Sequence, residues 1–225
     1  MDKLFINLNL FDMKKLIPFL FVFLLLASCE KDPDLDKVQD QYVIYTQYDK
    51  TANFSKGTTF FIADSVLSIT SDSKASYLAP AIGDYIINAY VSNMQSRGYT
   101  RVMDKADATY GMQISFVEST YYFTGNPYWW NSCPWYWSPS YWGPWYGGGW
   151  YYPYQFVYSY TNGSLIGEMV DLTSSTTTST SNKLTVIWNN YITGLLSGNS
   201  NISEANTVNA INQSFSQSPY LKYAR

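Results

Sequence analysis

The 225-residue sequence contains no histidine, only two cysteines and few charged residues, which make up 14% of the chain. Without histidine, it lacks the commonest general acid/base and the commonest metal ligand. Two cysteines are too few for a zinc site built from four thiolates. The formal net charge is −3, and Lys and Arg form no cluster. Because a nucleic-acid surface needs a basic stripe, we expect no nucleic-acid partner, and we expect neither a metal nor a cofactor.

The N-terminal segment has the pattern of an export signal. Lys14 and Lys15 precede Leu16–Leu26, an apolar stretch interrupted by one proline. The stretch is too short to cross a bilayer as a helix, and a charged start followed by a short apolar run is typical of a signal peptide. The pattern is complete from Met13, which we expect to be the true start of translation.

The signal ends in Leu26-Ala27-Ser28-Cys29, which matches a lipobox. In a lipobox the small residues let the chain lie extended in the peptidase, and the cysteine thiol is linked to diacylglycerol before cleavage. We therefore predict a lipoprotein with a signal peptide at residues 1–28, lipid attachment at Cys29 and acyl chains such as palmitate in the outer membrane of a cell envelope. Whether the domain faces the periplasm or the cell surface stays open. The alternative is an ordinary secretory signal with a chance cysteine.

The mature chain is predicted to contain a tether and one domain. Residues 29–40 form the tether, because Glu30–Asp40 is charged, nearly free of apolar residues and contains a proline. Residues 41–222 form the domain. With Cys29 acylated, Cys133 has no partner within the chain, and we expect it to be buried.

The hydrophobic pattern predicts an α+β domain: an antiparallel sheet with two helices packed on one face, plus a long aromatic-rich loop insert. A helix begins at Pro80 and ends at Arg97-Gly98. A second helix presents a stripe of Ala205, Val208, Ile211 and Phe215 and ends before Pro219. Apolar and β-branched runs predict strands at Tyr42–Tyr48, Thr58–Ile62, Met112–Phe116, Leu165–Leu172 and Leu184–Ile192.

The strands are predicted to have distinct faces. In Met112–Phe116 every second residue is apolar, which predicts one buried face and one polar face. In the last strand, one face is predicted to contain Leu184, Val186, Trp188 and Ile192. Thr173–Ser181, nine consecutive Ser and Thr residues, is interpreted as a long hairpin loop.

The insert, residues 119–160, is the most unusual part of the sequence. No residue from Ser119 to Gly167 is charged, and Phe, Trp or Tyr occupy twenty of the forty positions in Tyr121–Tyr160. Five prolines and a Gly-Gly-Gly run exclude a continuous helix. We expect its rings to pack first of all as a local aromatic core.

Two other interpretations of the insert stay open. The rings can bind a glycan by stacking on the C–H faces of sugars, or they can lie at a membrane interface, where amphipathic rings are favoured. The candidate glycan-binding residues are Trp135, Trp137, Trp142 and Trp145.

Several short motifs follow one another along the chain. They are the lipobox, Tyr48-Asp49, Phe54, Thr59-Phe60, Arg97-Gly98-Tyr99, Ala106-Asp107-Ala108, Gly163-Ser164-Leu165, Val170-Asp171-Leu172 and Trp188. In this order and spacing they resemble the envelope lipoprotein family called domain of unknown function 4136, and the resemblance covers Tyr42 to Leu221. The chain departs from the family in its Ser/Thr tract and its enlarged insert. The resemblance implies an exported, usually lipid-anchored α+β module without known catalysis.

The motifs that carry common chemistries are missing from the sequence: it has no phosphate-binding loop, nucleophile elbow or metal-ligand cluster. We expect Asp49 and Asp107 to cap turns and Glu168 to face solvent. The leading hypothesis is a non-catalytic binding or assembly module, whose partner is an envelope protein or a glycan. The alternatives are a surface glycan-binding lipoprotein and, from another class, a carboxylate-based hydrolase built from two of Asp49, Asp107, Glu118, Glu168 and Asp171, for which Asp49 and Glu118 are the residues to change in a test.

Overall fold

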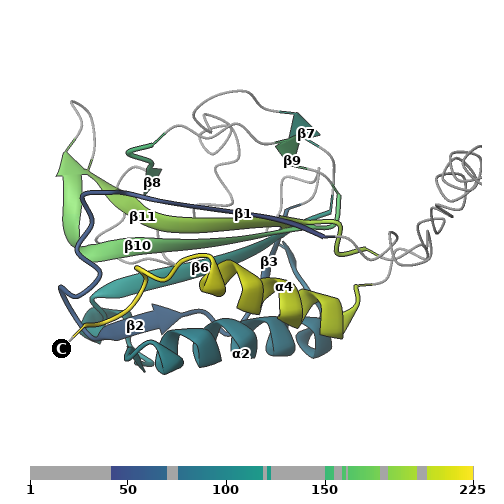
Figure 1. Cartoon of the computed structure of the whole chain (residues 1–225), viewed down its shortest axis with the longest axis horizontal. Coiled ribbons are helices and arrows are strands. Elements are labelled where there is room, and N and C mark those ends of the chain that lie inside the picture. The colour runs from purple at the N-terminus through teal and green to yellow at the C-terminus, as the bar shows by residue number, and fades with distance from the viewer. Residues whose placement is uncertain are drawn as a thin grey trace, which may run out of the picture. The chain divides into compact units, whose positions relative to one another are not determined.

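The computed structural model describes residues 42–69, 76–118, 121–122, 150–154, 159–160, 162–177, 182–196 and 202–224. Two helices and a large mixed sheet dominate these residues, and both helices lie on one side of the sheet (Figure 1). The signal peptide, the tether and Cys133 lie outside the described residues. Within the described residues, no helix is long and apolar enough to cross a membrane.

The main sheet has the order β1-β11-β10-β6-β2-β5. Its strands are β1 (Val43–Tyr48), β2 (Thr59–Ile62), β5 (Thr100–Arg101), β6 (Tyr110–Val117), β10 (Ser164–Thr177) and β11 (Asn182–Thr193). Three shorter strands belong to this sheet outside that order: β3 (Leu67–Ile69) pairs with β6 and with β4 (Ser76–Tyr77), and β8 (Trp150–Tyr151) pairs with β11. A separate two-stranded sheet consists of β7 (Tyr121–Tyr122) and β9 (Ser159–Tyr160).

The α+β class is confirmed, but the sheet is mixed. The pairs β1–β11, β11–β10 and β10–β6 are antiparallel, whereas β2 and β3 run parallel to β6. The chain passes through the first helix between β3 and β6, and such a crossover allows strands to be parallel. The strand pattern alone did not indicate this direction.

Helix α2 (Pro80–Ser96) confirms the first predicted helix. Pro80 stands in its first turn, where the missing N–H is not needed. Gly98 follows the end of the helix with a φ of 90°, a left-handed conformation that glycine adopts without a steric penalty. A short 3-10 helix, η2 (Lys105–Asp107), precedes β6, and the side chain that caps it is Asp104 rather than the predicted Asp107.

Helix α4 (Glu204–Ser216) is present, but its predicted apolar stripe is partly wrong. Ala205 is exposed and Val208 half-buried, whereas the buried face consists of Thr207, Ala210, Ile211, Ser214 and Phe215. The apolar pattern missed two polar residues on the buried face, Thr207 and Ser214. Their hydroxyl groups can be buried because both are hydrogen-bonded: Thr207 Oγ1 donates to Ser203 O, and Ser214 Oγ donates to Ile211 O, both at 2.7 Å.

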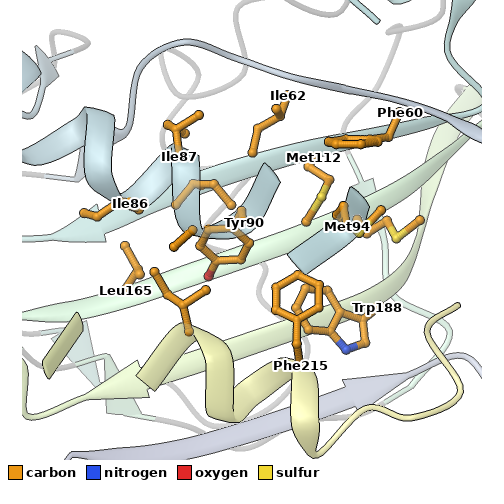
Figure 2. Close-up of a cluster of buried hydrophobic side chains, with 14 of the residues drawn as sticks. Phe60, Ile62, Ile86, Ile87, Tyr90, Met94, Met112, Leu165, Trp188 and Phe215 are labelled. Carbon is orange, nitrogen blue, oxygen red and sulfur yellow. The ribbon is translucent and has the colours of Figure 1, made fainter. Parts of the chain in front are cut away.

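The hydrophobic core lies between the helices and the sheet (Figure 2). Phe215 of α4 packs against Trp188 of β11, with ring centroids 5.1 Å apart, and against Tyr90 of α2 at 5.7 Å. All three side chains are fully buried. Each ring contributes a large apolar area, so this cluster joins both helices to the sheet.

The predicted common face of the last strand is wrong. Trp188 and Ile192 belong to the core cluster, but Leu184 and Val186 are buried outside it. Met169 pairs with Trp188 while Val170 pairs with Val186, so Ile187 is an extra residue in β11. This irregularity reverses the alternation of side chains, which a strict period of two does not anticipate.

Two further expectations about the strands are corrected. All eight residues of β6 are buried, including Gln113 and Ser115, so both faces of this strand are covered. The Ser/Thr tract is not a loop throughout, because β10 continues to Thr177 and Ser175–Thr177 pairs with the start of β11. Thr and Ser form strands readily when a neighbouring strand is available for pairing.

Candidate functional site

A row of polar side chains crosses the sheet on the face opposite the helices. Gly167 lies on the helix face, because a Cβ added there would meet Tyr90 of α2, so the next residue, Glu168, points the other way. The register places Glu168 beside Asn189 and Gln113, and Asn189 beside Gln47. Four neighbouring strands therefore each contribute one side chain to the row Gln47–Asn189–Glu168–Gln113, called the polar row below.

The polar row is buried at its centre and opens toward β1. Glu168 is 1% exposed, Asn189 4% and Gln113 5%. Gln47, on the edge strand β1, is half-buried. An interior this polar is costly unless its hydrogen bonds are made, so the partners of these atoms matter.

Two tyrosines that follow β8 reach the polar row. The hydroxyl of Tyr152 donates to Glu168 Oε1, and that of Tyr154 donates to Asn189 Oδ1 at 2.9 Å. Their rings meet edge to face, with centroids 6.2 Å apart. These contacts join the end of the aromatic insert to the centre of the sheet.

Two side-chain oxygens of the polar row are buried without a hydrogen-bond partner among the described residues: Gln47 Oε1, an acceptor, and Glu168 Oε2. The polar network on the helix face differs. There Tyr90 OH donates to Asn190 Oδ1 and Asn190 Nδ2 to Ser214 Oγ, both at 2.9 Å. The helix-side network is thus complete in itself, whereas the polar row has unused hydrogen-bonding capacity.

Burial favours the neutral form of the Glu168 side chain. Loss of contact with water raises the pKa of Glu168 from its ordinary value of 4.5 to about 8, and the hydrogen bond from Tyr152 opposes this shift only in part. No side chain of the polar row is Lys or Arg. At neutral pH the row is therefore uncharged and offers hydrogen bonds rather than ionic attraction.

Glu168 corrects the expectation that this residue faces solvent. Sequence analysis missed Gln47, Asn189 and Tyr152 as well. Polar residues in strands indicate a solvent face when one side of the sheet is bare, and only the three-dimensional structure shows that both sides are covered. One feature of the sequence could have indicated a buried Glu168: residues 119–167 contain no charged side chain, and Glu168 follows them directly.

The other predicted site residues are not brought together. Cys29, Trp135, Trp137, Trp142 and Trp145 lie outside the described residues. As expected, Asp49 caps a turn, accepting from the backbone N–H of Thr51 at 2.8 Å.

The two proposed hydrolase carboxylates lie far apart along the sheet. The backbone N–H of Asp49 is bonded to Ile187 O. Glu118 follows Val117, whose partner Ser164 lies at the other end of the β10–β11 pair. This offset of about six residues corresponds to roughly 20 Å along the strands. Glycosidase carboxylates lie at most roughly 9.5 Å apart, so this pair does not fit.

Metal-binding chemistry also finds no support in the part of the chain that the structure describes, where no group of three or more Cys, Asp or Glu side chains comes together. The acidic Asp171 is instead paired with Lys56, at 2.9 Å between Oδ2 and Nζ.

These features define a two-layer α+β domain with a helix-covered core on one face and a buried polar row on the other. A family model described as Domain of unknown function (DUF4136) matches residues 44–220, and the chain belongs to this family, which confirms the resemblance seen in the sequence. A crystal structure of a DUF4136 family protein from Bacteroides thetaiotaomicron VPI-5482 is 44% identical. The match has a TM-score of 0.71 and covers 81% of this chain and 98% of the other. A search among curated proteins finds no match.

Proposed function

We propose that the protein is a lipid-anchored, non-catalytic binding or assembly module of the outer membrane. The observation that carries this proposal is the lipobox cysteine Cys29, placed 14 residues before the first residue of the domain's first strand (43 − 29 = 14). At roughly 3.4 Å per residue, this length holds the domain within about 48 Å of the anchor. The separation of Asp49 and Glu118 argues against a hydrolase built on that one pair.

The anchor is tested by substitution of each cysteine in cells that express the full chain. We expect the wild type to incorporate a labelled palmitate analogue and to fractionate with membranes. Cys29→Ala should lose the label and leave the membrane fraction. Cys133→Ala, the matched control, should keep both properties. A Cys29→Ala protein that stays labelled and membrane-bound would contradict the proposal.

A second candidate function is glycan binding through Trp135, Trp137, Trp142 and Trp145. It is favoured by the absence of charge across the insert and by its density of rings, because sugar-binding surfaces combine aromatic faces with few polar groups. Titration of oligosaccharides, followed by tryptophan fluorescence, should show a saturable change that replacement of the four tryptophans by Ser abolishes. Protease treatment of intact cells shows in addition whether the domain faces outward, as this function requires.

A further inference from the structure

We propose that the open end of the polar row, at Tyr45 and Gln47 on β1, is a binding site for a neutral, hydroxyl-rich ligand of the glycan class. This inference rests on the binding role proposed above, but it depends neither on the lipid anchor nor on the tryptophans of the insert. Three observations carry it: an exposed ring, two buried side-chain oxygens without a described partner, and the absence of charge.

The exposed ring belongs to Tyr45. This residue is two positions before Gln47 in β1 and therefore lies on the same face of the sheet. Its side chain is 45% exposed, although the ring stacks on Tyr191 with centroids 6.2 Å apart and planes inclined by 26°. Tyr191 is itself buried, and its hydroxyl is hydrogen-bonded to Ser164 Oγ at 2.8 Å. Tyr45 is thus a ring on a fixed support, with part of its surface open to solvent.

One of the two oxygens lies next to this ring in β1, and the other lies further along the polar row. Gln47 Oε1 and Glu168 Oε2 are buried, and neither has a hydrogen-bond partner among the described residues. The strand β11 lies between their strands, so their backbones are roughly 10 Å apart. Asn189, between them, already accepts from Tyr154. Counted inward from the sheet edge, Tyr45 and Gln47 on β1 come first, Asn189 on β11 next and Glu168 on β10 last.

The chemistry of these groups selects the ligand. Anionic ligands are held most strongly by Lys or Arg, and the polar row contains neither. Cations are held best by ionised carboxylates, whereas burial raises the pKa of Glu168 to about 8 and favours its protonated form at neutral pH. Sugar hydroxyls both donate and accept hydrogen bonds, and a sugar also offers an apolar face to the ring of Tyr45. Ligand sites typically combine aromatic rings with a few placed polar groups in this way.

The experiment uses the mature protein, purified in a detergent without a sugar headgroup, and titrates it calorimetrically with maltohexaose, cellohexaose and xylohexaose. We expect at least one of them to bind the wild type. Tyr45→Ala and Gln47→Leu should each weaken that binding about tenfold or more, which is the effect of losing one good contact. Tyr77→Ala, which removes another exposed tyrosine from β4, is the matched control and should bind as the wild type does.

The outcomes separate this site from the other proposals. Circular dichroism should show that Tyr45→Ala is folded, because Tyr45 lies on the edge strand β1 and is 45% exposed. If none of the three sugars binds the wild type, the proposal is overturned. It is equally overturned if Tyr45→Ala and Gln47→Leu bind as tightly as the wild type, and binding lost only in the tryptophan variant then assigns the contact to the insert. The fractionation of Cys29→Ala reports on the anchor independently of all these results.

Discussion

Replacement of Glu168 by Gln should make the protein more stable at pH 8.5 and leave its stability almost unchanged at pH 4.5. The amide has the same shape as the carboxyl group and keeps an oxygen that accepts the hydrogen bond from Tyr152. It cannot ionise. The substitution therefore isolates the free energy that the native state loses because it holds an ionisable group in a buried place.

The direction follows from the two pKa values. Burial raises the pKa of Glu168 in the folded state to about 8, above the ordinary value of 4.5 that applies in the unfolded chain. Between these values the unfolded state releases the proton and the folded state retains it. The contribution of Glu168 to the free energy of unfolding is thus greatest below pH 4.5. It falls by up to about 1.4 kcal/mol per pH unit between the two pKa values and becomes level above pH 8.

Thermal melts at several pH values measure this effect. The melting temperature of the wild type should fall between pH 4.5 and 8.5, and Glu168→Gln should remove most of that fall, a difference on the order of 10 °C. Glu118→Gln removes an exposed glutamate next to β6 and is the control, which should follow the wild type. Parallel curves for the wild type and Glu168→Gln would show that Glu168 is already ionised in the folded protein.

The helices and most strands were predictable because each has a strong local signal. Pro80 and Gly98 mark the ends of α2 in the sequence, and the apolar alternation of Met112–Phe116 indicates a strand whatever surrounds it. Such signals depend on neighbours within a few residues. They give the existence of an element, its approximate bounds and the α+β class.

The polar row was not predictable, because it depends on contacts between distant parts of the chain. Gln47 and Asn189 are neighbours only through the register of β1 on β11. The burial of Glu168 follows from a sheet whose second face is covered as well as its first. The extra residue Ile187 also decides which side chains of β11 face the helices, and no local pattern marks it.

Substitution of Gly167 by Ala should destabilise the domain strongly, although it adds only one methyl group. A Cβ at this position would lie closer than 3.0 Å to Asn190 Oδ1, Tyr90 OH and Tyr90 Cε1. These atoms belong to the buried Tyr90–Asn190–Ser214 network, which cannot move without breaking hydrogen bonds. Overpacking costs about 1–3 kcal/mol, and an unpaired buried polar group costs about 1–3 kcal/mol more.

Gly83 offers the matched control for this prediction. It is also a buried glycine, in the interior of α2, but a Cβ there would lie 3.8 Å from the nearest atom, the backbone N of Val66, which is an ordinary contact. Gly83→Ala should therefore stabilise the protein by about 0.5–1 kcal/mol, since alanine favours a helix. Both substitutions restrict the unfolded chain equally, so their difference reports the clash in the native state.

Chemical denaturation of Gly167→Ala, Gly83→Ala and the wild type tests both signs at once. The double variant Gly167→Ala/Tyr90→Phe adds a sharper test, because loss of the Tyr90 hydroxyl removes one of the clashing atoms. The double variant should be destabilised by less than the sum of the two single variants. If the two effects simply add, the added methyl group does not contact Tyr90. The destabilisation by Gly167→Ala would then have a cause other than the close approach of β10 to α2.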